Sequence, residues 1–66
     1  MNIDAIGQNA GCVWNALSEK NAQSFKALKK MTKMKDKEIY PALGWLAREG
    51  KIAIEEAEDD FIVTLV

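Results

Sequence analysis

The sequence contains no histidine and only one cysteine, Cys12, among its 66 residues. A single cysteine excludes an internal disulfide, and without histidine the usual zinc and imidazole-metal ligand sets cannot form. The same absence removes the commonest general base and the Ser-His-Asp triad. No glycine-rich phosphate loop follows a strand-like segment. We therefore expect a protein that is not an enzyme and that uses no metal or cofactor.

Long apolar runs and targeting signals are also missing. No apolar run approaches the ~20 residues of a membrane helix. The first four residues lack the basic and apolar parts of a signal peptide. The lone thiol suits a reducing compartment. We expect a complete cytoplasmic protein without a membrane partner.

The length allows one domain, residues 1–66, and a domain of this size buries only about 60% of its unfolded surface. Small domains commonly gain further stability from disulfides, a metal or a partner chain. Because the first two are excluded, the size favours a partner chain, and we expect a homodimer.

The formal net charge of −1 conceals an uneven distribution. Between residues 20 and 37, seven lysines stand against one aspartate, a net charge of +6. Residues 38–66 carry two basic and seven acidic side chains, a net charge of −5. A dipolar distribution of this kind bears on association with partners rather than on fold.

Residues 3–17 place apolar side chains at steps of three and four, which predicts a helix with one apolar stripe. Asn2 is the expected N-cap, and Trp14 lies within the stripe and is expected in the core. Gly7 and Gly11 each cost about 1 kcal/mol relative to alanine inside a helix. They either permit a close helix contact or are merely tolerated, and the sequence leaves both open.

Two further helices are predicted. Residues 25–32, which follow a short extended piece, form the second, with Ser24 as its N-cap. Asp36 is the expected N-cap of a third helix that ends near Glu49. Pro41 is expected to distort the first turns of that helix, because proline removes a backbone donor and crowds the preceding turn.

After Gly50, a typical helix stop, the apolar period changes from about four to two. Residues 51–55 and 61–66 are predicted as strands, and the acidic segment between them as a hairpin loop. The fold class is therefore mainly α with a small β-hairpin: three helices followed by two strands.

This order resembles the winged helix-turn-helix superfamily. The segment LKKMTKMKD (residues 28–36) is similar to its second helix and turn, and IYPALGWLAREGKI (residues 39–52) to its recognition helix and first wing strand. Residues 42–52 are also similar to short stand-alone winged-helix proteins of Bacteroides-type bacteria, a group of uncharacterised function. The resemblance implies a bacterial, transcription-regulator-like protein that contacts double-stranded DNA through the second helix, turn and third helix.

Two features depart from the pattern of that superfamily. Lys33 stands near the place where the turn often has a glycine with positive φ. The wing loop, often basic in DNA-binding members, carries five acids here: Glu55, Glu56, Glu58, Asp59 and Asp60. Carboxylates are repelled by phosphates, which opposes contacts between the wing and DNA.

A lysine cluster and one tyrosine form the candidate DNA surface. These residues are Lys26, Lys29, Lys30, Lys33, Lys35, Lys37 and Tyr40. Lysines that neutralise phosphates release counterions, so binding would depend steeply on salt. Base-reading side chains are scarce at the start of the third helix, which favours backbone contacts over sequence readout. The alternative is a solvated lysine face that maintains solubility.

The competing interpretation is a protein-interaction or homodimerisation module without DNA binding. Its candidate surface comprises Ala5, Cys12, Ala16, Trp45, Ile62 and Val66. Trp45 falls at about 240° from Ile39, away from the apolar stripe, so either the wing or a partner covers it. Apolar residues on both faces of the last strand indicate that something covers its second face. A second copy is the favoured cover, and another protein is the alternative.

Overall fold

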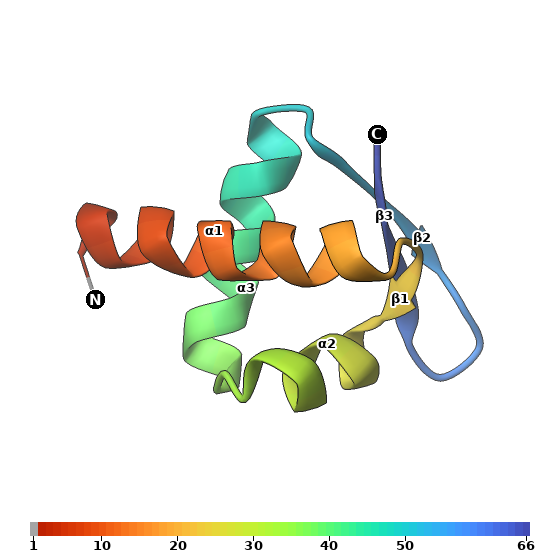
Figure 1. The fold of residues 1–66 in the computed structure, drawn as a ribbon. Coiled ribbons are helices and arrows are strands. Elements are labelled where there is room, and N and C mark those ends of the chain that lie inside the picture. The colour runs from red at the N-terminus through yellow and green to blue at the C-terminus, as the bar shows by residue number, and fades with distance from the viewer. Residues whose placement is uncertain (1) are drawn as a thin grey trace.

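The computed structural model describes residues 2–66 as three helices and a three-stranded antiparallel sheet. The helices are α1 (Ile3–Glu19), α2 (Phe25–Thr32) and α3 (Asp36–Arg48), and the strands are β1 (Gln23–Ser24), β2 (Ile52–Glu56) and β3 (Phe61–Leu65). Figure 1 shows α1 crossing α3, with the sheet beside the C-terminal end of α1. Within residues 2–66 no helix is long and apolar enough to cross a bilayer. The predicted fold class is confirmed, with one additional strand.

Two helix starts agree with the expected caps. The Asn2 side-chain oxygen accepts a hydrogen bond from the Ala5 backbone N–H at 2.7 Å. The Ser24 hydroxyl accepts one from the Ala27 N–H at 3.1 Å. Each cap satisfies a backbone donor that the first turn of a helix otherwise leaves unpaired.

The start of α3 differs from the prediction at its cap. Lys35 is the N-cap and Asp36 the first helical residue, so the expected Asp36 cap is wrong. Instead, the Glu38 carboxylate reaches back and accepts a hydrogen bond from the Lys35 N–H at 2.9 Å. α3 continues unbroken through Pro41, so the proline does not end the helix, and the expected distortion of its first turns stays a prediction. Pro41 is half-buried on the side opposite the apolar stripe of α3, and the Lys37 carbonyl loses its helical donor there.

The turn between α2 and α3 carries the strained lysine that the sequence suggested. Lys33 has φ 58° and ψ 27°, in the left-handed region, and its N–H donates to the Lys29 carbonyl at 2.8 Å. A side chain with a Cβ is disfavoured there, and glycine is the usual residue. Gly50, with φ 71°, performs the same task after α3.

Replacing Lys33 with Gly is therefore expected to increase the free energy of unfolding by about 0.5–1 kcal/mol, because it removes the Cβ contact. Lys33→Ala is the matched control, since it removes the same charge but keeps the Cβ. Urea unfolding followed by circular dichroism measures both. Equal stability of the two variants would contradict strain at this position.

The core lies between the three helices and the inner face of the sheet. Its buried residues are Ala10, Val13, Ala16, Leu17, Phe25, Leu28, Ile39, Ala42, Leu43, Leu46, Ile52 and Val63. Met34, Phe61 and Leu65 pack against this cluster.

The buried side of α1 is rotated relative to the predicted stripe. Trp14 is 43% exposed, so its expected place in the core is wrong, and Ile3 is 70% exposed. Ala16, predicted as part of an interaction surface, is buried. Gln23 is also buried, and its side-chain amide donates to the carbonyls of Ala16 at 3.1 Å and Lys20 at 2.7 Å. These bonds satisfy carbonyls at the end of α1 and link that end to β1.

The short extended piece before α2 is a strand, which makes β3 the central strand of the order β1-β3-β2. The expected two-stranded wing is thus extended by β1, which pairs through only two residues. Just before β1 begins, the Asn21 side-chain oxygen accepts a hydrogen bond from the Leu65 N–H at 2.7 Å. On the outer face of β3, Ile62 is half-buried, and Val66, the residue after the strand, is 85% exposed.

Candidate nucleic-acid interface

The helix-turn-helix places the predicted lysines on adjoining elements. Lys26, Lys29 and Lys30 lie on α2, Lys33 is its C-cap, Lys35 is the N-cap of α3, and Lys37 lies in its first turn. All are exposed except Lys29, which is half-buried. The local folding of this segment therefore gathers the positive charge around one turn.

Lys29 is already engaged within the fold. Its ammonium group pairs with the Asp36 carboxylate, the only ion pair among residues 2–66. The same Nζ lies 5.6 Å from the centroid of the Phe25 ring, within the range of a cation–π contact. Lys29 thus links α2 to the start of α3, and its charge is largely compensated there.

Tyr40 is held by an aromatic stack. Its ring lies 4.9 Å from the Phe25 ring at an interplanar angle of 16°, and Phe25 lies 4.8 Å from Phe61. Tyr40 nevertheless remains 52% exposed. The stack fixes the position of a half-exposed tyrosine beside the lysines, which suits a phenol that donates a hydrogen bond to a phosphate.

Arg48, which is not among the residues predicted from the sequence, lies on the same side of α3 as Lys37. Lys37 and Arg48 are separated by three turns of α3, so both lie on one side of the helix, about 16 Å apart. Both are exposed, and so is Gly44 between them. A Cβ added at Gly44 would meet nothing within 4 Å. The outer stripe of α3 is therefore basic at both ends, with Pro41 and the bare backbone of Gly44 between them. The 11-residue spacing of Lys37 and Arg48 predicts that both lie on this side.

The acidic wing loop touches the lysine surface at one point. Asp60 accepts hydrogen bonds from the backbone N–H of Lys26 at 3.2 Å and of Phe61 at 2.7 Å. Partial desolvation raises the pKa of Asp60, but these hydrogen bonds and the Lys26 charge outweigh it and lower the pKa below 3.8. Lys26 therefore has an acid beside it, whereas Lys30, Lys33, Lys35 and Lys37 do not form ion pairs in the described chain.

The lowered pKa of Asp60 predicts a pH-dependent contribution to stability. A carboxylate whose folded pKa lies below its unfolded value stabilises the fold above the unfolded pKa, and this stabilisation is lost as the pH falls through the folded pKa. Wild type is thus expected to melt at a higher temperature than Asp60→Asn at neutral pH, and the difference should shrink below about pH 4. Asp59→Asn removes the same charge from the same loop and is the control. A difference that is independent of pH would contradict this role of the Asp60 charge.

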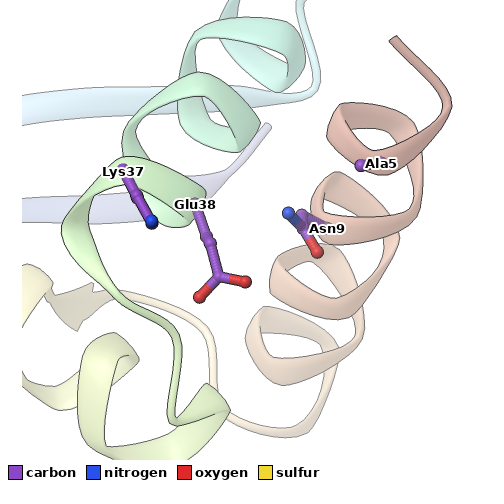
Figure 2. Close-up of a pocket in the computed structure, with 4 residues that line it drawn as sticks. All are labelled: Ala5, Asn9, Lys37 and Glu38. Carbon is purple, nitrogen blue, oxygen red and sulfur yellow. The ribbon is translucent and has the colours of Figure 1, made fainter. Parts of the chain in front are cut away.

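A groove of ≈ 240 Å³ lies between α1 and the start of α3. Its lining residues are Ala5, Asn9, Lys37 and Glu38, and Figure 2 shows Glu38 and Asn9 reaching into the gap from opposite helices. Glu38 already serves as the backbone acceptor at the start of α3. Within residues 2–66 no three His, Cys, Asp or Glu side chains are grouped to hold a metal ion. The groove thus offers neither a nucleophile with a base nor a metal site.

The predicted interaction residues do not form one surface. Cys12 is exposed and lines a separate groove together with Ala16 and Met31. Ala5 lines the groove of Figure 2, and Ile62 and Val66 belong to the outer face of the sheet. Trp45 is 37% exposed and lines a third groove, opposite α1.

Three helices with a turn between α2 and α3, closed by the β2–β3 hairpin, define a winged helix-turn-helix domain. The profile of the family described as "Winged helix-turn-helix domain (DUF2582)" matches residues 1–65, and the chain belongs to this family. The solution NMR structure of protein BT2368 from Bacteroides thetaiotaomicron is similar, with a TM-score of 0.86 and 34% identity over 98% of this chain and 79% of that chain. No curated protein matches the chain. Neither match indicates a catalytic family.

Proposed function

We propose that the protein binds double-stranded DNA through α2, the turn and α3, and that it contacts the phosphate backbone rather than reading bases. The observation that carries this proposal is a set of exposed cations without an ion-pair partner in residues 2–66. These are Lys30, Lys33, Lys35, Lys37 and Arg48. In helix-turn-helix proteins, the corresponding elements face the backbone and the major groove.

The outer stripe of α3 favours binding without sequence readout. In helix-turn-helix proteins the N-terminal residues of the recognition helix read the bases, most often through arginine, asparagine or glutamine. The start of α3 has none of these three residue types, Gly44 lies in the middle, and Arg48 stands at the far end. Such a stripe permits a close approach of the helix backbone and places its charges where phosphates flank the groove.

The wing is expected to stay away from DNA. Glu55, Glu56, Glu58 and Asp59 are exposed along the end of β2 and the loop that follows. Their repulsion by phosphates opposes a wing contact and leaves the lysines of the turn as the main source of affinity. The wing loop instead contacts the start of α2, where Asp60 accepts a hydrogen bond from the Lys26 backbone N–H.

Fluorescence anisotropy with a labelled random-sequence duplex tests the proposal. The variant Lys30→Ala/Lys37→Ala is expected to bind about tenfold more weakly per lysine at ~50 mM salt, because each lost phosphate contact forfeits its counterion release. Lys20→Ala/Lys51→Ala removes two lysines outside the surface and should bind like wild type. Absence of wild-type binding even at low salt, or equal weakening by both variants, would refute DNA binding through this surface.

A further inference from the structure

A groove with one tryptophan on each side lies between α1 and the second half of α3. Trp14 of α1 and Trp45 of α3 line it and are 43% and 37% exposed. The groove encloses ≈ 290 Å³, and Leu46 of the core also lines it. None of the lysines assigned to DNA lines it. We call it the Trp groove.

Two glycines of α1 also line the Trp groove. A Cβ added at Gly7 or Gly11 would meet nothing within 4 Å, so neither glycine permits a close helix contact within one chain. Each nevertheless costs about 1 kcal/mol of helix stability relative to alanine. Their effect in the monomer is to leave open space beside two partly exposed indoles.

Rim charges of both signs complete this surface. Glu49 is the C-cap of α3 and Lys51 precedes β2. Both side chains line the Trp groove and are exposed, and neither forms an ion pair within residues 2–66. A rim of one sign would repel its own copy, whereas one acid and one base two residues apart can pair with a copy of themselves.

We propose that the Trp groove is the interface of a two-fold homodimer. In a two-fold interface, residue i of one copy meets residue j of the other, and j meets i. The indoles of one copy can therefore insert beside the open glycine backbone of the other copy, so one patch supplies both sides of the contact. Glu49 pairs with Lys51 of the partner subunit, and this pair occurs twice.

The expected association is weak, and its strength follows from area. The two indoles together expose about 200 Å² per subunit, judged from their exposed fractions and the ~250 Å² of a tryptophan side chain. A standard interface buries about 800 Å² per partner, so the indoles supply roughly a quarter of it. Tryptophan at the centre of a small patch is a favoured anchor, and dimers are expected between ~10 μM and ~1 mM protein.

A charge exchange tests the two-fold pairing by sedimentation equilibrium over this concentration range. Glu49→Lys alone and Lys51→Glu alone are each expected to weaken the dimer about tenfold or more, since two attractive contacts become repulsive. The double variant Glu49→Lys/Lys51→Glu exchanges the signs and should restore dimerisation. Glu58→Lys, in the wing loop, is the control and should dimerise like wild type. A wild-type chain that stays monomeric at ~1 mM overturns the proposal, as does a double variant that fails to recover.

A substitution that fills the space beside the indoles distinguishes an effect on dimerisation from an effect on folding. Gly11→Leu is expected to raise the melting temperature at low concentration, where the chain is monomeric, because leucine favours helix more than glycine does. The same variant should abolish the dimer at ~1 mM, because its side chain occupies the space that receives the partner's indole. A Gly11→Leu protein that is folded and dimerises as well as wild type would overturn the assignment to the Trp groove.

Discussion

Raising the salt concentration from about 50 to about 200 mM is expected to lower the affinity for a random duplex by roughly 10²–10³-fold. Five cations that neutralise phosphates predict a slope of about −4 to −5 in a plot of log K against log salt. They are Lys30, Lys33, Lys35, Lys37 and Arg48, all of which are exposed. Anisotropy titrations at four or five salt concentrations measure the slope. A slope near zero would show that these cations do not meet phosphates.

Variants of the lysine surface test whether its cations produce that salt dependence. Each lysine replaced by alanine should flatten it by about one, whereas variants outside the surface should leave it unchanged. Neutralising the wing through Glu56→Gln/Glu58→Gln should strengthen binding, because it removes repulsion near the duplex. Because the acidic loop is expected to lower the affinity for DNA, weaker binding by the Glu56→Gln/Glu58→Gln variant would indicate direct contact between the wing and DNA.

Replacing Leu28 with Ala is expected to destabilise the fold by about 2–5 kcal/mol. Leu28 is fully buried and is part of the core cluster that the helices share with the sheet. A domain of this size rarely has more than ~3–5 kcal/mol of net stability, so the variant is expected to be largely unfolded at room temperature. Circular dichroism with urea denaturation measures this effect.

Met31→Ala is the matched control for that substitution. Met31 lies one turn further along α2 but is 42% exposed, so its truncation should cost much less than that of Leu28. Comparable losses for the two variants would contradict the burial pattern of α2.

Local signals predicted most of the fold. The bounds of α2, the caps at Asn2 and Ser24 and the stop at Gly50 depend on residues within one or two turns, and all are confirmed. The errors arose where distant segments decide. The rotation of α1, which exposes Trp14, depends on how α1 packs against α2, α3 and β3. Periodicity within one helix does not contain that information.

The candidate site shows the same division. The position of the lysines on α2, the turn and α3 followed from their spacing, and Lys33 at positive φ was expected from its place in the turn. The contact of Asp60 with the start of α2 joins residues 34 positions apart and was not predictable from local pattern. Arg48 was predictable, because an 11-residue separation returns to the same side of a helix.

Chemical-shift mapping tests the central claim most directly. ¹⁵N-labelled protein at constant concentration is titrated with a random-sequence duplex at low salt, so that self-association does not change during the experiment. Binding through α2, the turn and α3 should concentrate the amide shifts in residues 30–40 and near Arg48, while residues 55–59 and the indole N–H of Trp14 stay unchanged. Absence of any shift, or shifts confined to the wing loop or the Trp groove, would contradict DNA binding through α2, the turn and α3.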